Sequence, residues 1–200
     1  MCRFIESIRV EDGHPCLLPF HEERMNRTRA AFFPAATSFS LAGCLPEGAA
    51  GPGVWKWRLV YDREGIREWT CVPYVMRPVK SLRLVTDDTV EYAYKRVDRS
   101  ALETCFARRG QADDVLIVRR GLLTDTSIAN IALWNGQRWY TPASPLLRGV
   151  RRRALLEAGV LEERDISAGD LGRYTRIRLF NALIGWGELE LPVCCVSACE

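Results

Sequence analysis

Lysine and histidine are scarce in this chain of 200 residues. Only three of its 28 basic residues are lysines (Lys56, Lys80 and Lys95), and it has two histidines. None of its eight cysteines forms a CxxC pair, so we expect no metal site and interpret the scattered thiols as small apolar fillers. A lysine kept in an arginine-rich chain is of interest because it can lose its proton and act as an amine nucleophile, which an arginine cannot do.

Long apolar runs and strong net charge are also absent. No run reaches the length of a membrane span, and Arg3 and Glu6 interrupt the place where a signal peptide would have its apolar core. We therefore expect a cytoplasmic protein that has no membrane partner. The net charge is only +3, and acidic residues lie throughout the chain, so we expect no nucleic-acid partner either.

The first part of the chain predicts two hairpins and a helix. Alternating residues in FIESIRV, followed by the turn EDG, predict a hairpin near the N-terminus. A helix is expected over residues 21–33, a loop or a short helix with loops over 34–53, and a second hairpin over 54–76. The segment RPVKS is a candidate linker. We therefore expect a smaller α/β domain over residues 1–78 and a larger α/β domain over 79–200.

The rest of the chain predicts strands with two helices, so the fold class is α+β or α/β. Strands are expected at LRLV, at DVLIV, in the segment 121–142 with a turn at Asn135 and Gly136, and at YTRIRLFNALIGW. Ser100 and Glu103 have the spacing of a capping box, and Gly110 would end that helix. A second helix is expected in PLLRGVRRRALLEAG, ending at Gly159.

Three residues are candidates for chemistry. Lys95, next to Tyr94, is either a solvated loop lysine or an amine that aromatic neighbours help to deprotonate. Asp125 lies between two apolar strands, where it either caps the turn at Ser127 or faces a protonated ring nitrogen. Gly149 precedes a basic helix, and the N–H groups at a glycine-led helix start bind phosphate well.

The order of these features resembles the class IV aminotransferase family, the fold type IV pyridoxal-phosphate enzymes. The similar segments are FIESIRVEDGHPCLLPFHEERM, YKRVDR, TDTSIANIALW, LLRGVRR and LFNALIG. The resemblance implies a two-domain D-amino-acid aminotransferase-like fold, pyridoxal 5'-phosphate as the cofactor, a small-molecule amino substrate and a homodimer. It also implies that the larger domain carries the cofactor lysine.

The resemblance assigns roles to the matched residues. Lys95 matches the lysine that binds the cofactor covalently and then acts as a base. Asp125 matches the acid that pairs with the pyridine nitrogen, and Arg24 matches the arginine that clamps the phosphate. The remaining matches are Gly149, Val150 and Arg151, at the helix start whose backbone amides hold the phosphate, and Asn181, a polar position near the phosphate.

The chain departs from the family in three respects. It starts almost at the first motif, so we expect an N-terminally shortened fold in which a partner subunit could complete the substrate pocket. Asp125 stands where the family has glutamate, and Arg151 stands where a small or hydroxyl residue is common.

LFNALIG is similar to the 4-amino-4-deoxychorismate lyase branch, which releases pyruvate in folate biosynthesis. We expect that activity. An amino acid aminotransferase of the branched-chain or D-amino-acid type, and a non-catalytic phospholigand-binding member, are the alternatives.

Overall fold

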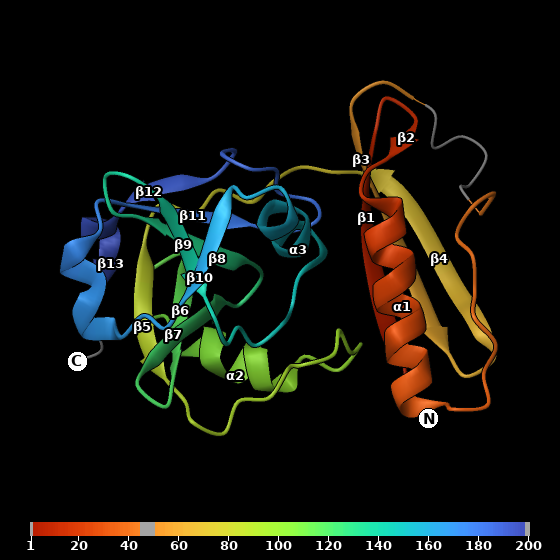
Figure 1. Ribbon diagram of the computed structural model, residues 1–200, viewed down its shortest axis with the longest axis horizontal. Helices are drawn as coiled ribbons and strands as arrows, with labels where there is room; N and C mark the ends of the chain where they lie inside the picture. Colours follow the sequence, from red (N-terminus) through yellow and green to blue (C-terminus); the bar gives the residue numbers. More distant parts are fainter. Residues whose placement is uncertain (1, 45–50, 199–200) are drawn as a thin grey trace. The chain divides into compact units, whose positions relative to one another are not determined.

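The computed structural model describes residues 2–44 and 51–198, which form two compact units (Figure 1). The first unit comprises Met1–Met76 and Tyr94–Asp98, and the second comprises Arg77–Ala93 and Arg99–Glu200. The break at residues 76 and 77 lies close to the boundary expected from the sequence. The segment around Lys95, however, groups with the first unit and not with the second.

Backbone hydrogen bonds explain why the Lys95 segment belongs to the first unit. The N–H of Ile5 donates to the carbonyl of Lys95 at 2.9 Å, and the N–H of Val97 donates to the carbonyl of Arg3 at 3.1 Å. Between them, Phe4 and Arg96 form an antiparallel bridge. The chain thus returns to pair with the first strand, a long-range contact that local sequence patterns do not reveal, so the expectation that the larger unit carries Lys95 is wrong.

The first unit is an antiparallel sheet of order β2-β1-β3-β4 that packs against one helix (Figure 1). Both predicted hairpins are present. Asp12 and Gly13 form the first turn with φ of 48° and 81°, the left-handed backbone that a two-residue hairpin turn needs. The elements are β1 (Phe4–Glu11), β2 (His14–Pro15), α1 (Leu18–Phe32), β3 (Val54–Asp62) and β4 (Gly65–Pro73).

Helix α1 begins three residues before the predicted start at residue 21. Proline is tolerated in the first turn of a helix because the N–H that it lacks has no partner there, and Pro19 occupies such a position. Met25 on α1 packs with Phe4, Ile8 and Trp57 from the sheet in one buried core. The helix therefore presents its inward face, which includes His21 and Arg24, to β1.

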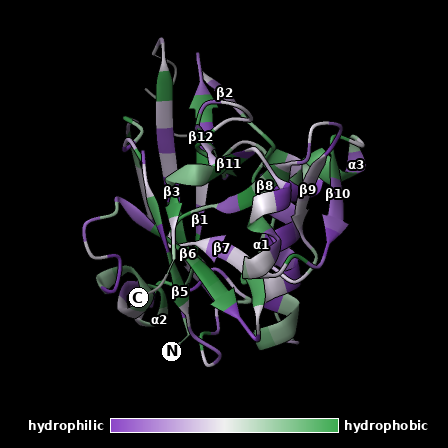
Figure 2. Ribbon diagram, turned by 90° about the vertical axis from the view of Figure 1, so that its left-hand side faces the viewer, coloured by the Kyte–Doolittle hydropathy of each residue, from purple (hydrophilic) through white to green (hydrophobic). Residues whose placement is uncertain are grey.

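The second unit contains a mixed sheet of order β10-β9-β8-β7-β6-β5-β13, with β11 added beside β8. The β5–β6, β5–β13 and β9–β10 pairs are parallel, whereas the remaining pairs are antiparallel. Apolar residues are concentrated in its central strands (Figure 2). The strands are β5 (Leu82–Thr86), β6 (Asp114–Arg119), β7 (Leu122–Thr126), β8 (Asn130–Trp134), β9 (Trp139–Pro142), β10 (Leu161–Arg164), β11 (Arg176–Phe180), β12 (Glu190–Pro192) and β13 (Val196–Ser197).

The helices of the second unit are short. They are α2 (Ser100–Ala107), α3 (Val150–Glu157) and the 3-10 helices η1 (Ala168–Arg173) and η2 (Val193–Cys195). The predicted capping box is wrong: Arg99 is the N-cap of α2 and Ser100 is already helical. Gly159 follows α3 with a φ of 68°, as a helix-ending glycine should. In residues 2–44 and 51–198, no helix is long and apolar enough to cross a membrane.

Candidate active site

A buried charge cluster joins β1 to α1 in the first unit. Glu6 is completely buried, and its carboxylate accepts hydrogen bonds from Arg24 Nε at 2.9 Å, from Arg24 Nη2, and from His21 Nδ1 at 2.6 Å. Burial alone would raise the pKa of Glu6, but the Arg24 charge and the His21 hydrogen bond outweigh burial and hold that pKa at about 2. Glu6 is therefore a charged and fully compensated carboxylate.

His21 is neutral in this cluster. Burial is the largest influence and lowers its pKa, and the positive charges of Arg24 and Lys95 lower it further, against the opposing effect of Glu6. A carboxylate only accepts hydrogen bonds, so the proton of the neutral ring lies on Nδ1. Nε2 is consequently an acceptor, and it is buried with no hydrogen-bond partner in the described part of the chain.

Lys95 lies on the irregular connection that precedes α2 and is half-buried. Its electrostatic influence on His21 places it near the charge cluster within the first unit. Tyr94 beside it packs its ring against Phe32, with 4.7 Å between the centroids. The backbone of Lys95 is thus anchored on one side by β1 and on the other by an aromatic contact.

Asp125 is the buried carboxylate of the second unit. It lies on β7, only 5% exposed, and its oxygens accept hydrogen bonds from Asn130 Nδ2 at 2.8 Å and from the N–H of Leu147 at 2.8 Å. Among the residues that the structure describes, it forms no ion pair. Burial raises its pKa to about 6, because hydrogen bonds from neutral groups and the more distant Arg152 charge only partly offset the loss of hydration.

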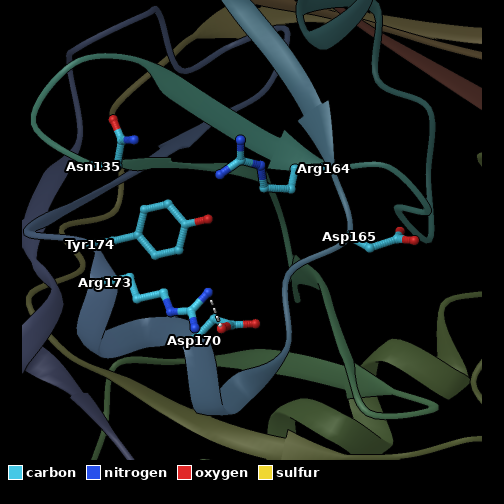
Figure 3. A pocket seen from close by; sticks show the side chains of 6 residues that line it. All are labelled: Asn135, Arg164, Asp165, Asp170, Arg173 and Tyr174. Carbon is cyan, nitrogen blue, oxygen red and sulfur yellow. Dashed lines mark ion pairs between the residues drawn. The ribbon is translucent and has the colours of Figure 1, made fainter.

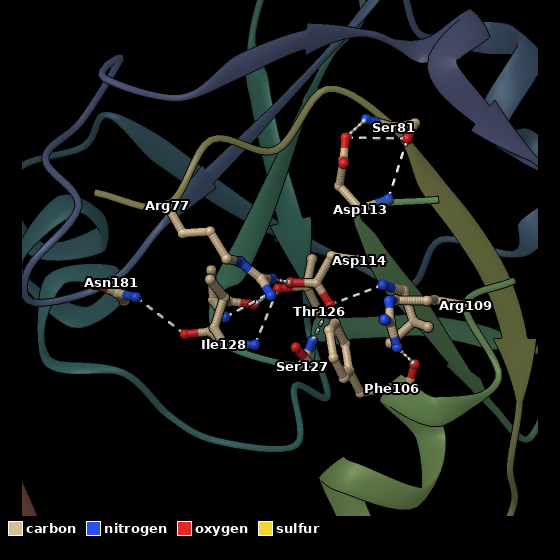
Figure 4. A network of polar contacts seen from close by, with 12 residues as sticks. Arg77, Ser81, Phe106, Arg109, Asp113, Asp114, Thr126, Ser127, Ile128 and Asn181 are labelled. Carbon is tan, nitrogen blue, oxygen red and sulfur yellow. Dashed lines mark hydrogen bonds and ion pairs between the residues drawn. The ribbon is translucent and has the colours of Figure 1, made fainter. Parts of the chain in front are cut away.

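The turn after Asp125 is fixed by other residues. Asp125 does not cap Ser127, as one interpretation of the sequence had it, because the N–H of Ser127 donates to Asp114 Oδ1 at 3.3 Å (Figure 4). Arg99 Nη2 donates to the carbonyl of Ser127 at 2.8 Å. Asn181 Nδ2 donates to the carbonyl of Ile128 at 3.0 Å (Figure 4). Asp125 therefore does not hold this turn, and its two oxygens instead accept the hydrogen bonds from Asn130 and Leu147.

Gly149 is the N-cap of α3, and within residues 2–44 and 51–198 no side chain caps that helix start. The N–H groups of Val150 and Arg151 follow in the first turn. The side chain of Arg151 is directed elsewhere, since its Nε donates to the carbonyl of Asn181 at 2.7 Å and its Nη2 to that of Ala182 at 3.1 Å. The helix start is thus an arrangement of backbone donors that suits an anion.

Asn181 organises the loop after β11. Its Oδ1 accepts from the N–H groups of Leu183 and Ile184, both at 2.8 Å, while its Nδ2 holds Ile128. These contacts give the Asn181 side chain a structural task, and its proximity to a phosphate remains a prediction.

The structure thus gathers the predicted residues within two separate units. Arg24 and Lys95 belong to the first unit. The second unit contains Asp125, Gly149, Val150, Arg151 and Asn181.

Sequence reasoning missed Glu6, His21 and Asn130. Each lies in one of the segments that resemble the family. The signal that could have identified them is a polar residue within an apolar strand or on an apolar helix face.

A pocket of about 230 Å³ lies elsewhere in the second unit (Figure 3). It contains none of the predicted site residues. In it, Arg173 pairs with Asp170 at 3.2 Å, and Arg164 stacks 3.7 Å from the centre of the Tyr140 ring. Its lining residues are Asn135, Arg164, Asp165, Asp170, Arg173 and Tyr174.

Comparison with known proteins identifies relatives along nearly the whole chain. The family model described as amino-transferase class IV matches residues 72–189. An uncharacterized protein of Haemophilus influenzae is 31% identical over 189 residues, which cover 92% of this chain and 100% of that protein.

Solved structures share the fold. A putative 4-amino-4-deoxychorismate lyase from Haemophilus somnus 129pt has a TM-score of 0.87 and 29% identity, over 93% of this chain and 98% of that chain. A putative amino-acid aminotransferase from Mesorhizobium loti has a TM-score of 0.82 and 24% identity over 100% of both chains. A hypothetical aminotransferase from Mycobacterium tuberculosis, in its PLP-bound form, has a TM-score of 0.76 and 18% identity over 97% of this chain and 81% of that chain. These similarities confirm the fold class that the sequence predicts.

Proposed function

The chain belongs to the class IV aminotransferase family, and we propose that it is a pyridoxal-phosphate-dependent enzyme with 4-amino-4-deoxychorismate lyase activity. The enzyme would release pyruvate from aminodeoxychorismate and leave 4-aminobenzoate. The name of the Haemophilus somnus relative supports this choice, as does the similarity of LFNALIG to the lyase branch. The homodimer remains part of the proposal.

The observation that carries the proposal is the buried, unpaired carboxylate of Asp125. A carboxylate that loses its hydration needs a cation to compensate its charge, and Asp125 has only neutral hydrogen-bond donors among the described residues. Each carboxylate oxygen can accept a second hydrogen bond. A protonated pyridine nitrogen, which brings a positive charge and an N–H donor, fits this requirement.

The start of α3 fits the phosphate of the same cofactor. Gly149 leaves the first turn without a side-chain cap, so the N–H groups of Val150 and Arg151 are suited to oxygen atoms of an anion. We assign the phosphate to these groups. In the first unit, Arg24 Nε and Nη2 are directed to Glu6, and a phosphate contact of Arg24 remains a prediction from the family resemblance.

Lys95 is the proposed amine. Bound pyridoxal phosphate supplies an electron sink for the carbanion that forms when a substrate loses its α proton. Lys95 would bind the cofactor covalently and, once displaced by the substrate amine, would take and return the substrate proton. The β1 contact that holds the Lys95 carbonyl fixes the backbone from which this side chain extends.

Cofactor trapping tests the assignment. We expect the purified protein to turn yellow with pyridoxal phosphate, and borohydride to fix the cofactor on Lys95, as read by peptide mass spectrometry. Lys56 and Lys80 are internal controls, because label on either of them in place of Lys95 would contradict the assignment. A Lys95→Arg variant keeps the positive charge and should lose both label and activity.

Product analysis then separates the activities. Pyruvate and 4-aminobenzoate should appear from aminodeoxychorismate with the wild-type protein and not with Lys95→Arg. A yellow protein that forms no pyruvate but converts an amino donor into its keto acid would instead be an aminotransferase. A colourless protein that binds phosphorylated ligands would be a non-catalytic family member.

A further inference from the structure

Asn130 closes a ring of hydrogen bonds around Asp125. Its Nδ2 donates to Asp125 Oδ1 and to the carbonyl of Leu147, both at 2.8 Å. The N–H of Leu147 donates to Asp125 Oδ2 at 2.8 Å and completes the ring. Both backbone groups of Leu147 are therefore engaged two residues before Gly149, the N-cap of α3.

The ring also fixes which way the Asn130 amide points. Nitrogen and oxygen of an amide are assigned from their partners, and two acceptors on one side place the nitrogen there. The Oδ1 of Asn130 consequently faces Gly149. A Cβ at residue 149 would lie 3.3 Å from Asn130 Cγ and would approach Oδ1 far more closely than Cβ atoms in proteins do.

Gly149 is not needed for its backbone conformation. Its φ of −67° and ψ of 147° are extended angles that any L-residue adopts. The requirement for glycine therefore comes from the close approach of Asn130, and not from the turn itself.

We propose that Asn130 is a positioning residue that fixes Asp125 relative to the first turn of α3, and that residue 149 is glycine because Asn130 occupies its side-chain space. The effect of this positioning on cofactor binding rests on the proposed function. The ring nitrogen and the phosphate of one cofactor molecule lie at a separation set by covalent bonds. The carboxylate and the helix start must therefore be held at a matching separation, and Asn130 is the side chain that contacts both.

A double-mutant cycle tests the spatial part of the proposal without any cofactor. In the wild-type background, Gly149→Ala should lower the apparent Tm by roughly 3 °C or more, because the new methyl group overlaps Asn130. In the Asn130→Ala background the same substitution should have little effect, since the overlapping group is gone. If Asn130→Ala does not fold, Asn130→Ser, which also withdraws the amide from Gly149, replaces it in the cycle.

Ligand binding tests the functional part. The readout is the ratio of the dissociation constants of pyridoxal and pyridoxal phosphate, measured by equilibrium titration of the full chain. Asn130→Ala should lower this ratio roughly tenfold, because the phosphate site no longer matches the carboxylate.

Asn135→Ala is the matched control. Asn135 lies directly after the other end of β8, and its Oδ1 accepts hydrogen bonds from the N–H groups of Gln137 and Arg138 at 3.0 and 2.9 Å. Its loss should lower stability while leaving the ratio unchanged.

The results of these experiments separate a failure of the positioning role of Asn130 from a failure of the proposed function. Equal effects of Gly149→Ala in both backgrounds, or an unchanged ratio in Asn130→Ala, would overturn the positioning role even in a protein that binds the cofactor well. A wild-type protein that binds no pyridoxal phosphate would refute the proposed function, and the double-mutant cycle would still decide whether Asn130 excludes a side chain at residue 149.

Discussion

Two buried carboxylates, one in each unit, are held in opposite ways. Glu6 is fully buried, and Arg24 pairs with it through two nitrogens, so its pKa is about 2. Asp125 is almost as deeply buried but, in the part of the chain that the structure describes, receives hydrogen bonds only from neutral donors, and its pKa is about 6. Burial acts in the same direction on both groups, so the difference comes from the Arg24 charge, with the His21 hydrogen bond adding to it.

The comparison indicates which carboxylate is available for a ligand. Glu6 is already compensated and serves to hold Arg24 and His21 in place. Asp125 keeps an uncompensated charge that a cationic group would stabilise. The protein thus uses one carboxylate for its own architecture and leaves the other for a positively charged partner, which we propose is the protonated ring of the cofactor.

The largest effect is expected from breaking the compensated pair. Arg24→Leu should lower the free energy of unfolding by about 3–5 kcal/mol, because it leaves Glu6 buried without its cation. Arg3→Leu is the control, since Arg3 pairs with Glu68 on the surface and the two side chains are 49% and 58% exposed. That loss should change the free energy of unfolding by about 1 kcal/mol or less. Urea denaturation measures both, and equal effects would contradict the distinction.

The pH dependence of Glu6 should follow from its depressed pKa. Its folded pKa of about 2 lies below the ordinary value of 4.5, so its contribution to stability is complete above pH 4.5 and is lost as the pH falls towards 2. The wild type should exceed Glu6→Gln in free energy of unfolding by about 3 kcal/mol at neutral pH. This gap should narrow below pH 4.5. A gap that stays constant down to pH 3 would show that Glu6 is not the titrating group.

The change in stability with pH that comes from Asp125 should have the opposite sign to that from Glu6. Its folded pKa of about 6 lies above the ordinary 3.8, so stability is greatest below pH 3.8 and declines as the pH rises through 6. This one group should cost the cofactor-free protein roughly 2 kcal/mol between pH 4 and pH 7. Asp125→Asn should remove that decline, as measured by urea denaturation across this range. A variant with the same pH slope as the wild type would refute the raised pKa.

A third buried carboxylate, Asp114, extends the comparison, and a smaller loss of stability is expected when its cation is removed. Asp114 is fully buried, and it is paired at 2.9 Å with Arg77, whose side chain is 46% exposed. The N–H groups of Val115 and Ser127 also donate to it. Arg77→Gln should therefore lower the free energy of unfolding by only about 1 kcal/mol, because solvent already screens the pair. If Arg77→Gln lowered the free energy of unfolding as much as Arg24→Leu, the exposure of the cation would not determine how strongly the pair stabilises the protein.

Local patterns predicted the elements better than they predicted the site. The alternation in FIESIRV, the EDG turn and the glycine after α3 reported interactions between neighbours in sequence, and the structure confirms each. The start of α1 and the cap of α2 were wrong, because Pro19 extends one helix and Ser100 is helical in the other.

Contacts between distant residues were beyond the reach of local patterns. The pairing of Lys95 with Ile5 spans most of the first unit, so periodicity could not assign that segment. Glu6 lies in a strand in which almost every residue is buried, so alternation did not reveal that its carboxylate faces α1. Asn130 lies in the segment TDTSIANIALW, but its contact with Gly149 depends on the fold of the loop between β9 and α3, which local patterns do not predict.

The pKa of Asp125, followed by NMR of carboxyl-labelled aspartate with and without pyridoxal phosphate, tests the central claim most directly. Asp125→Asn assigns the signal. The cofactor-free protein should give a pKa of about 6, and loading should lower that pKa well below this value, because a protonated ring nitrogen compensates the carboxylate. An ordinary pKa in the free protein, or a value that the bound cofactor leaves unchanged, would contradict the account.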